Sequence, residues 1–514
     1  MTKLPPCSEY NSLHWGDDNK QDGYTAKLRI LKERGFNLHR HLRKRNPSAV
    51  FLMVAVGVFL STMDSSMINV ALPSIMRSFG TSLAKTEWVV LIYLLTITVS
   101  LLFWGQLADR VGLTRIYLSG MLVFSIASVA CYFSATLFQL ITFRFVQGLG
   151  AAMMMATGPG IIKVVFLPGD LGKALGLVGV ATSVGLMLGP VISGILIQHF
   201  SWRGLFLVTA PISFFVTIAG LFFLKPFSNV VVSERETFPF DWAGMALWTG
   251  MISLSVLIAT HHSGIAIGIL LIKVLACLTL FLLLVKTERG KQNPLFPLSL
   301  FRNSSYAIAM FCAALSFAVL FVVLILMPFY LDFVLGLPPK KIGLVMMAVP
   351  ISVFFVSPLS GYFYDRIGAR LLTTSGLSIA ALGLLLLCCL SAESSAFAVA
   401  WRLAVLGCGQ ALFLSPNSAT VLKSVDPGKL ALSSGMLATA RNLGMLAGAA
   451  LAGLVFGIVF RQYSGGLDLN QYTPDQAQSF IYALRMTFLF TAVFSVLGAV
   501  LSSFRGKERL VNTQ

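Results

Sequence analysis

"GQLADRVGLTR" occupies residues 105–115, and a near copy, "GYFYDRIGAR", occupies residues 361–370. Each copy begins with a glycine, places Asp-Arg four residues later, and places a second glycine three residues after the Asp. The copies start 256 residues apart, about half the length of the 514-residue chain. An internal repeat on this scale indicates that the chain consists of two related halves.

The sequence around both copies is strongly apolar. Hydrophobic residues make up 56% of the chain and charged residues 11%, whereas a soluble protein carries about 25% charged residues. Apolar runs of about 20 residues recur along the chain, and each is long enough to cross a hydrocarbon core of about 30 Å. We therefore predict an all-α polytopic membrane protein. The fourteen predicted spans are 49–71, 86–107, 113–133, 138–160, 174–198, 203–224, 242–262, 264–286, 304–327, 341–363, 370–391, 396–422, 432–460 and 478–503.

The net charge of +18 does not indicate a nucleic-acid partner, because the basic residues follow the membrane topology. When both termini are placed in the cytoplasm, 27 Lys and Arg residues fall in cytoplasmic segments and 6 in external loops. Basic residues are enriched in the cytoplasmic loops of membrane proteins. The sequence thus predicts a multi-pass protein with both termini cytoplasmic.

The two copies of the repeated phrase divide the chain. They follow the second and the tenth predicted spans, so two sets of six spans remain when the seventh and eighth are set aside. The predicted domains are a basic cytoplasmic tail (1–48), an N-terminal six-helix bundle (49–224), a linker with the inserted spans 7 and 8 (225–303), a C-terminal six-helix bundle (304–503) and a cytoplasmic tail (504–514).

The repeated phrase is a candidate conformational latch. Glycines permit close helix approach and tight turns, and Asp109 at a helix end can pair with an arginine or cap another helix. Such a contact can exist in one arrangement of two bundles and break in another. The alternative is a turn whose charges serve only topology. The predicted latch residues are Gly105, Asp109, Arg110, Gly112, Arg115, Asp365 and Arg366.

Buried charges give the most specific functional prediction. Of the twenty acidic residues, only Asp64 falls well inside a predicted span, where an acid costs about 2.5–3.5 kcal/mol on insertion scales. Arg144 in the fourth span lies at a similar depth. We predict a proton or cation site at Asp64 with Arg144 as its partner. The alternative is a static ion pair that only fixes helix register. Arg441, near mid-depth in the thirteenth span, is a further candidate for a cavity or a latch.

The fifth predicted span carries a second structural signal. Gly185, Gly189 and Gly194 leave a smooth groove for a partner helix, and Pro190 allows a bend. A sealed, bendable helix contact suits an exporter that must not leak. Ordinary packing of small residues is the alternative.

Several phrases carry a family resemblance. "GQLADRVGLTR" resembles the cytoplasmic loop signature of the major facilitator superfamily, and "RFVQGLGAA" (144–152) resembles its fourth-span signature. "GLMLGPVISG" (185–194) resembles the fifth-span signature of the proton-coupled exporters. "MDSSMINVALP" (63–73) resembles the first-span signature of the fourteen-span drug:proton antiporter branch (EmrB/QacA-like multidrug efflux transporters). The sequence departs from the family pattern at Leu113 and Thr114, where basic residues are usual, and at Glu87, where an amide is frequent.

The resemblance implies the major facilitator fold, with two six-helix bundles plus an inserted helix pair, in a bacterial inner or plasma membrane. It implies a proton-coupled secondary active exporter (an antiporter) of hydrophobic or amphipathic compounds, as in multidrug efflux and drug resistance. One alternative is the same fold with a dedicated lipid, siderophore or metabolite substrate. An alternative of another class is a non-transporting membrane sensor or scaffold.

The expected partners are a small substrate, protons, the lipid bilayer and, in a diderm bacterium, a periplasmic adaptor protein. The chain contains no HExxH, no Walker A loop and no GxGxxG after a strand. We therefore expect no enzymatic activity, no cofactor and no metal site.

Overall fold

The computed structural model describes residues 47–166, 168–223, 241–260, 267–289, 291, 298–425 and 430–506. Every regular element within these ranges is helical, so the predicted all-α fold is confirmed. The predicted basic tail, 1–48, lies almost entirely outside the described residues, as does most of the predicted C-terminal tail, 504–514.

The first half of the chain forms six long helices and one short one. Their bounds are α2 (Pro47–Phe79), α3 (Leu83–Thr86), α4 (Trp88–Val111), α5 (Leu113–Tyr132), α6 (Leu137–Val165), α7 (Pro168–His199) and α8 (Gly204–Phe223). The first predicted span, 49–71, is too short, because α2 continues through Pro73 to Phe79. A helix in a membrane protein tolerates a proline where neighbouring groups satisfy the freed backbone.

The second half follows an inserted helix pair. The bounds are α9 (Trp242–Ala259), α10 (Ile267–Glu288), α11 (Ser304–Phe329), α12 (Pro339–Met346), α13 (Ala348–Ile367), α14 (Ala369–Cys388), α15 (Ala396–Lys423), α16 (Leu430–Tyr463) and α17 (Ala477–Ser503). α11 runs on into a π-helical turn, Tyr330–Val334. The predicted tenth span, 341–363, is divided between α12 and α13, which meet at Met347.

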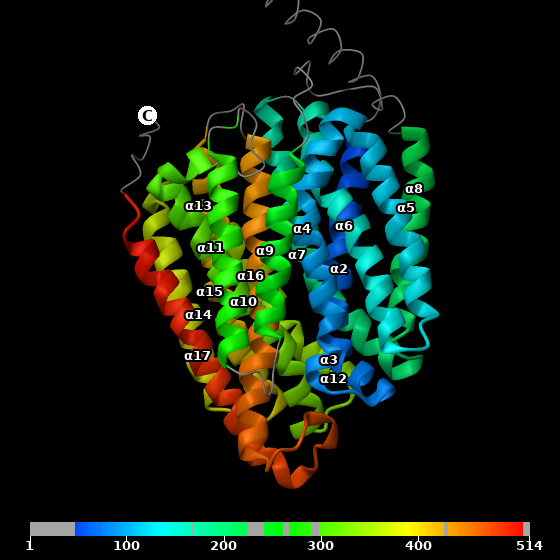
Figure 1. Ribbon diagram of the computed structural model, residues 1–514, viewed down its shortest axis with the longest axis vertical. Helices are drawn as coiled ribbons and strands as arrows, with labels where there is room; N and C mark the ends of the chain where they lie inside the picture. Colours follow the sequence, from blue (N-terminus) through cyan, green and yellow to red (C-terminus); the bar gives the residue numbers. More distant parts are fainter. Residues whose placement is uncertain are drawn as a thin grey trace, which may run out of the picture. The chain divides into compact units, whose positions relative to one another are not determined.

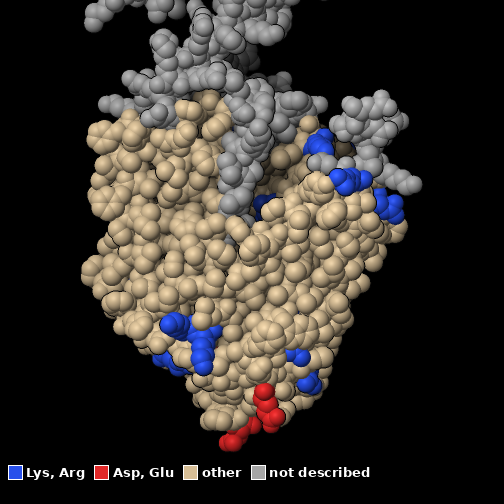
Figure 2. Space-filling model, turned by 180° about the vertical axis from the view of Figure 1, so that it is seen from behind, with Lys and Arg blue, Asp and Glu red and all other residues tan. Residues whose placement is uncertain are grey.

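The described helices have the length and the apolar composition of membrane-spanning helices. Twelve stretches within the described ranges are long and apolar enough to cross a bilayer. α7 and α10, whose side chains are only partly described, occupy the two remaining predicted spans, so the total of fourteen crossings stays a prediction. Large apolar side chains point outward, with Phe138, Phe222 and Phe397 76–79% exposed. In Figure 2 most of the described surface is uncharged, and Lys and Arg lie mainly toward its two ends.

The two halves repeat the same helix contacts. α6 packs against α4 and α5, and α5 against α8; correspondingly, α15 packs against α13 and α14, and α14 against α17. The halves meet where α7 contacts α12 and α13, and where α16 contacts α3 and α4. The order of these helices can be followed in Figure 1.

Both copies of the repeated phrase form the turn between two helices. Gly112 separates α4 from α5 with φ of 108°, and Gly368 separates α13 from α14 with φ of 80°. These left-handed conformations favour glycine because a Cβ would clash with the backbone. The close helix approach predicted at Gly105 is not found. Within the described part of the chain, no neighbouring element comes within 4 Å of where its Cβ would stand, because this face of α4 is open.

The inserted pair touches both halves. α9 and α10 pack against each other, and α9 also packs against α4 and α16 (Figure 1). Trp248 of α9 donates a hydrogen bond from Nε1 to the carbonyl oxygen of Thr98 in α4, at 3.3 Å.

A cluster of three charged residues joins the N-terminal end of α9 to the C-terminal end of α10. Lys291 Nζ lies 2.6 Å from Asp241 Oδ2 and 3.0 Å from Glu288 Oε1, and the Glu288 side chain is fully buried. Asp241 also caps α9 by accepting a hydrogen bond from the Gly244 amide. Burial opposes ionisation of Asp241 and Lys291, but their hydrogen bonds and mutual attraction outweigh it. The result is a lowered pKa for Asp241 and a raised pKa for Lys291.

The Lys291→Met variant should lose roughly 1–3 kcal/mol of stability, because the buried Glu288 carboxyl loses its cation. Because the pKa of Asp241 is lowered on folding, its contribution to the free energy of unfolding is fully present above about pH 3.9. Because the pKa of Lys291 is raised, its contribution to the free energy of unfolding is fully present below about pH 10.4. The difference between wild type and variant should therefore be constant around neutral pH. Thermal unfolding in detergent measures it. Lys286→Met, at an exposed position of α10, is the control, and equal midpoints for the two variants would contradict the assignment.

Candidate transport site

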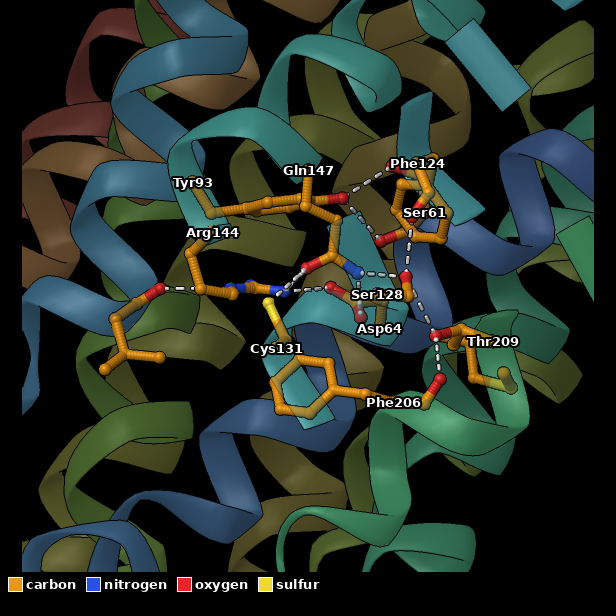
Figure 3. Close-up of polar contacts among 12 residues, drawn as sticks. Ser61, Asp64, Tyr93, Phe124, Ser128, Cys131, Arg144, Gln147, Phe206 and Thr209 are labelled. Atoms are coloured by element: carbon orange, nitrogen blue, oxygen red, sulfur yellow. Dashed lines mark hydrogen bonds and ion pairs between the residues drawn. The ribbon is translucent and has the colours of Figure 1, made fainter. Parts of the chain in front are cut away.

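Two charged side chains are sealed inside the first bundle. Asp64 lies midway along α2, Arg144 lies two turns into α6, and each side chain is 1% exposed. Arg144 Nη1 is 2.5 Å from Asp64 Oδ2, so they form a buried ion pair, as Figure 3 shows. The sequence predicted the two residues at similar depth, and the structure brings them into direct contact.

Gln147 bridges the ion pair from the next turn of α6. Its Oε1 accepts from Arg144 Nη1 at 2.7 Å, and its Nε2 donates to Asp64 Oδ1 at 3.0 Å. The same Nε2 donates to Ser128 Oγ of α5 at 2.8 Å. Gln147 was not among the predicted residues. Its position three residues after Arg144 was the available signal, because that spacing places side chains on one helix face.

Tyr93 of α4 covers the Arg144 guanidinium. The Tyr93 ring centre is 4.1 Å from Arg144 Cζ, and its hydroxyl lies 3.1 Å from Ser61 Oγ of α2. Arg144 Nε donates to the carbonyl oxygen of Val89 at 3.2 Å. A desolvated cation over an aromatic face gains about 2 kcal/mol. Four helices, α2, α4, α5 and α6, therefore hold the pair (Figure 3).

The site is closed to water in this arrangement. Both carboxyl oxygens of Asp64 are hydrogen-bonded, one by Arg144 and the other by Gln147. Counted over the whole residue, Asp64, Arg144 and Gln147 are each 0% exposed. Exchange of a proton between Asp64 and solution therefore requires a movement of the surrounding helices.

A small cavity lies between the two halves of the chain. Its volume is about 40 Å³, and residues of α2, α7, α11, α12 and α13 line it. The lining is apolar apart from Ser66 and Asn69, which follow Asp64 on α2. Ser66 donates a hydrogen bond to the Met63 carbonyl oxygen at 3.0 Å, so its hydroxyl is satisfied.

Asn69 is the polar group that this cavity leaves unsatisfied. It is 0% exposed, and neither its Nδ2 nor its Oδ1 has a hydrogen-bond partner within the described ranges. Leaving a buried polar group unpaired costs about 1–3 kcal/mol, so Asn69 is suited to bind a polar group of a ligand. Asn69 was not among the predicted residues, although it lies within "MDSSMINVALP".

The glycines of α7 contact helices of both halves. A Cβ on Gly185 would come within 2.7 Å of the Phe59 carbonyl oxygen in α2, and Gly189 packs against Ser66 of the same helix. A Cβ on Gly194 would come within 2.6 Å of the Pro339 carbonyl oxygen in α12. On the same stretch of α7, the carbonyl of Pro190 lies against Gly343 of α12.

Arg441 lies apart from the ion pair. Its Nη2 donates to Ser418 Oγ of α15 at 2.7 Å, and its Cζ is 5.5 Å from the Phe317 ring centre in α11. All three residues belong to the second half of the chain. The structure therefore does not bring Arg441 together with Asp64 and Arg144.

The predicted latch residues lie at one end of the helices, which we call the Asp109 end. Asp109, Arg110 and Arg115 occupy exposed positions around the turn between α4 and α5. In the second copy, Arg366 Cζ is 4.6 Å from the Tyr362 ring centre. The side chain of Asp365 lies outside the described residues. The latch role stays a prediction.

The two halves are joined by an ion pair at the opposite end, which we call the Arg77 end. Arg77, in the last turn of α2, places Nη2 2.6 Å from Asp332 Oδ2 beyond α11. Arg77 Cζ also lies 5.3 Å from the Phe333 ring centre. Neither Arg77 nor Asp332 was among the predicted site residues, because each falls outside the apolar runs.

The two halves repeat the same helix contacts, an ion pair is sealed within the first bundle, and a cavity lies between the halves. This combination is typical of polytopic membrane transporters. The chain belongs to the Major Facilitator Superfamily, whose family model matches residues 54–449.

The relatives include transporters with different cargoes. The chain is 32% identical to the riboflavin transporter RibZ of Clostridioides difficile (strain 630), over 88% of this chain and 96% of the relative. It is 30% identical to the multidrug resistance protein Stp of Mycobacterium tuberculosis (strain CDC 1551 / Oshkosh), over 85% of this chain and 81% of the relative. Its fold resembles a bacterial homologue of the human lysosomal transporter Spinster in an inward-facing, unoccupied conformation. The TM-score is 0.63 at 16% identity, over 89% of this chain and 96% of that chain.

Arg144→Met should destabilise the protein by roughly 3–5 kcal/mol, because it leaves the buried Asp64 carboxylate without its cation. The double variant Asp64→Asn/Arg144→Met should regain most of that loss, since it removes both charges together. Thermal unfolding of the three proteins in one detergent measures the difference. A double variant as unstable as Arg144→Met would show that the ion pair is not the source of the loss.

Proposed function

We propose that this transporter is a proton-coupled secondary active exporter (an antiporter) of hydrophobic or amphipathic compounds. The observation that carries the proposal is the sealed Asp64–Arg144 pair on the helix that also lines the cavity between the halves. The similarity to a multidrug resistance protein supports the substrate class. The proposal includes membership of the fourteen-span drug:proton antiporter branch.

The contacts of Arg144 allow Asp64 to bind and release a proton. When Asp64 is protonated, the guanidinium keeps its hydrogen bonds to Gln147 and to the Val89 carbonyl, and it keeps the Tyr93 ring. The cation is therefore satisfied in either protonation state of Asp64. A group that carries a proton needs an environment of this kind, since neither state then disrupts the fold.

The proton site and the cavity share α2. Asp64 and Asn69 are five residues apart on this helix, which corresponds to a rise of about 7.5 Å. A displacement of α2 that opens the ion pair to water also moves the Asn69 side chain in the cavity. Proton exchange and substrate binding are thereby linked through one rigid element.

The charge distribution supports an orientation. We place both termini and the Asp109 end in the cytoplasm, in a bacterial inner or plasma membrane, with the Arg77 end outside. The contact between Arg77 and Asp332 then closes the external side. The repeated phrases act as latches on the cytoplasmic side, and in a diderm bacterium a periplasmic adaptor is the partner at the Arg77 end.

Asp64→Asn should abolish uphill export driven by a pH gradient, because the amide has no carboxyl to carry the proton. Downhill exchange of substrate should persist, since the amide can still accept from Arg144. Asp64→Glu should retain part of the activity with a shifted pH optimum. The measurement is gradient-driven transport in proteoliposomes containing each protein. Full uphill export by Asp64→Asn would place the proton elsewhere.

A dedicated substrate is the second candidate function. It is favoured by the similarity to a riboflavin transporter and by the unsatisfied amide of Asn69 in the cavity. A carrier that selects one polar or amphipathic metabolite can recognise it through a hydrogen bond to the Asn69 amide, whereas a pump for apolar compounds gains nothing from that amide.

Asn69→Leu should weaken transport of substrates that hydrogen-bond to the amide by about 2- to 13-fold, the equivalent of one net hydrogen bond of about 0.5–1.5 kcal/mol. Transport of wholly apolar compounds should change little. Competition assays with riboflavin and with a panel of lipophilic dyes separate these outcomes. Ser66→Ala is the matched control in the same cavity, since the Ser66 hydroxyl already bonds the Met63 carbonyl. Equal losses for both variants and all compounds would exclude a specific role for Asn69.

A further inference from the structure

A second acidic side chain, Glu87, is buried between the two halves, two residues before Val89, whose carbonyl oxygen accepts a hydrogen bond from Arg144. Glu87 lies between α3 and α4 at the Arg77 end and is 0% exposed. Neither of its carboxyl oxygens has a hydrogen-bond partner within the described ranges. With respect to the described part of the chain, this carboxyl is therefore both buried and unpaired in this arrangement.

The surface that covers Glu87 comes from the other half of the chain. α16 packs against α3 and α4, and its Gly453 faces the Glu87 carboxyl. A Cβ on Gly453 would overlap both carboxyl oxygens. The absence of a side chain at Gly453 therefore leaves the space that the carboxyl occupies, and the burial of Glu87 depends on contact between the halves.

Among the described residues of the elements packed around Glu87, no cation pairs with its carboxyl. Lys85 of α3 is exposed, and Arg115 of α5 and Lys163 of α6 lie toward the Asp109 end. The other charged groups on neighbouring helices are bonded elsewhere: Arg144 of α6 to Asp64, Arg77 of α2 to Asp332, Arg461 of α16 to Asp468, and Arg441 of α16 to Ser418.

An ionised carboxylate without water, a cation or a hydrogen-bond donor is strongly unfavourable, and a carboxyl in such a place takes up a proton instead. We propose that Glu87 is a second proton-binding site, and that the two halves close over it at the Arg77 end only when it is protonated. Opening of this end parts α16 from α4, admits water to the carboxyl and allows the proton to leave.

This site differs in role from the proposed site at Asp64. Glu87 gains and loses its proton on the same side of the membrane, since it is reached only when the Arg77 end is open. It therefore sets the pH at which that end closes and does not carry the proton across. The inference goes beyond the proposed function and does not depend on proton coupling at Asp64.

Difference infrared spectroscopy tests the protonation directly. In an Asp64→Asn background, protein at neutral pH should show a carbonyl band of a protonated carboxyl, and this band should be lost in Asp64→Asn/Glu87→Gln. The background removes any contribution from Asp64, so the result does not depend on whether Asp64 couples protons. An identical band with and without Glu87 would overturn the proposal.

Distance measurements between spin labels on the two halves at the Arg77 end test the consequence. In wild type, the ratio of closed to open protein should rise as the pH falls, by at most about tenfold per pH unit, the limit for one bound proton. Glu87→Gln should be closed at all pH values, because the amide is always neutral, and Gly453→Ala should favour the open state. Glu393→Gln, at an exposed acid in the loop between α14 and α15, is the control and should behave as wild type. The same pH dependence in wild type and Glu87→Gln would refute the closure mechanism.

Discussion

A hydrocarbon environment supplies no hydrogen bonds, and every polar group placed within it has to be satisfied by the protein itself. This constraint explains why all described regular elements are helices and why charged residues are scarce along them. It also explains the form of the site. Asp64 and Arg144 are accompanied by Gln147, Ser128 and Tyr93 because an isolated ion pair would leave lone pairs and donors unmet. The cost of burying these charges is what makes the pair sensitive to the movement of any helix that holds it.

The same constraint gives different results at three of the buried polar positions, Asp64, Asn69 and Glu87. Asp64 is fully bonded, so its environment accepts a charge. Asn69 is neutral and has no hydrogen-bond partner among the described residues, so its environment favours a ligand with hydrogen-bonding groups. Glu87 is ionisable and also lacks a partner in the described ranges, so its environment favours the neutral acid. These positions lie at successive places between the middle of the helices and the Arg77 end. We propose that each responds to a different species: a proton carried across, a substrate, and the acidity of one compartment.

The fold was largely predictable, because bilayer thickness fixes helix length and leaves a run of apolar residues for each span. The importance of Asp64 was also predictable from the sequence, because an acidic residue inside an apolar span raises the free energy of membrane insertion and is rarely kept without a function. The roles of Gln147 and Asn69 could not be predicted, because an uncharged amide changes the hydropathy of an apolar run only slightly. Whether such an amide matters depends on the helix face that it occupies. The burial of Glu87 was also unpredictable, because it stands in the first turn of a span and is covered by Gly453 from the opposite half. The end of α2 and the break at Met347 depend on tertiary contacts that composition does not encode.

The contact between α7 and α12 has a mechanical consequence. Gly194 meets the backbone of Pro339, and Gly343 meets the backbone of Pro190, so two main chains touch with few side chains between them. Interlocked side chains have to change rotamer before two helices separate, and each change adds to the barrier. Two smooth backbone surfaces part without such steps. The seam between the halves is thereby closely packed, and its smooth backbone surfaces place few side-chain barriers against separation of the two halves.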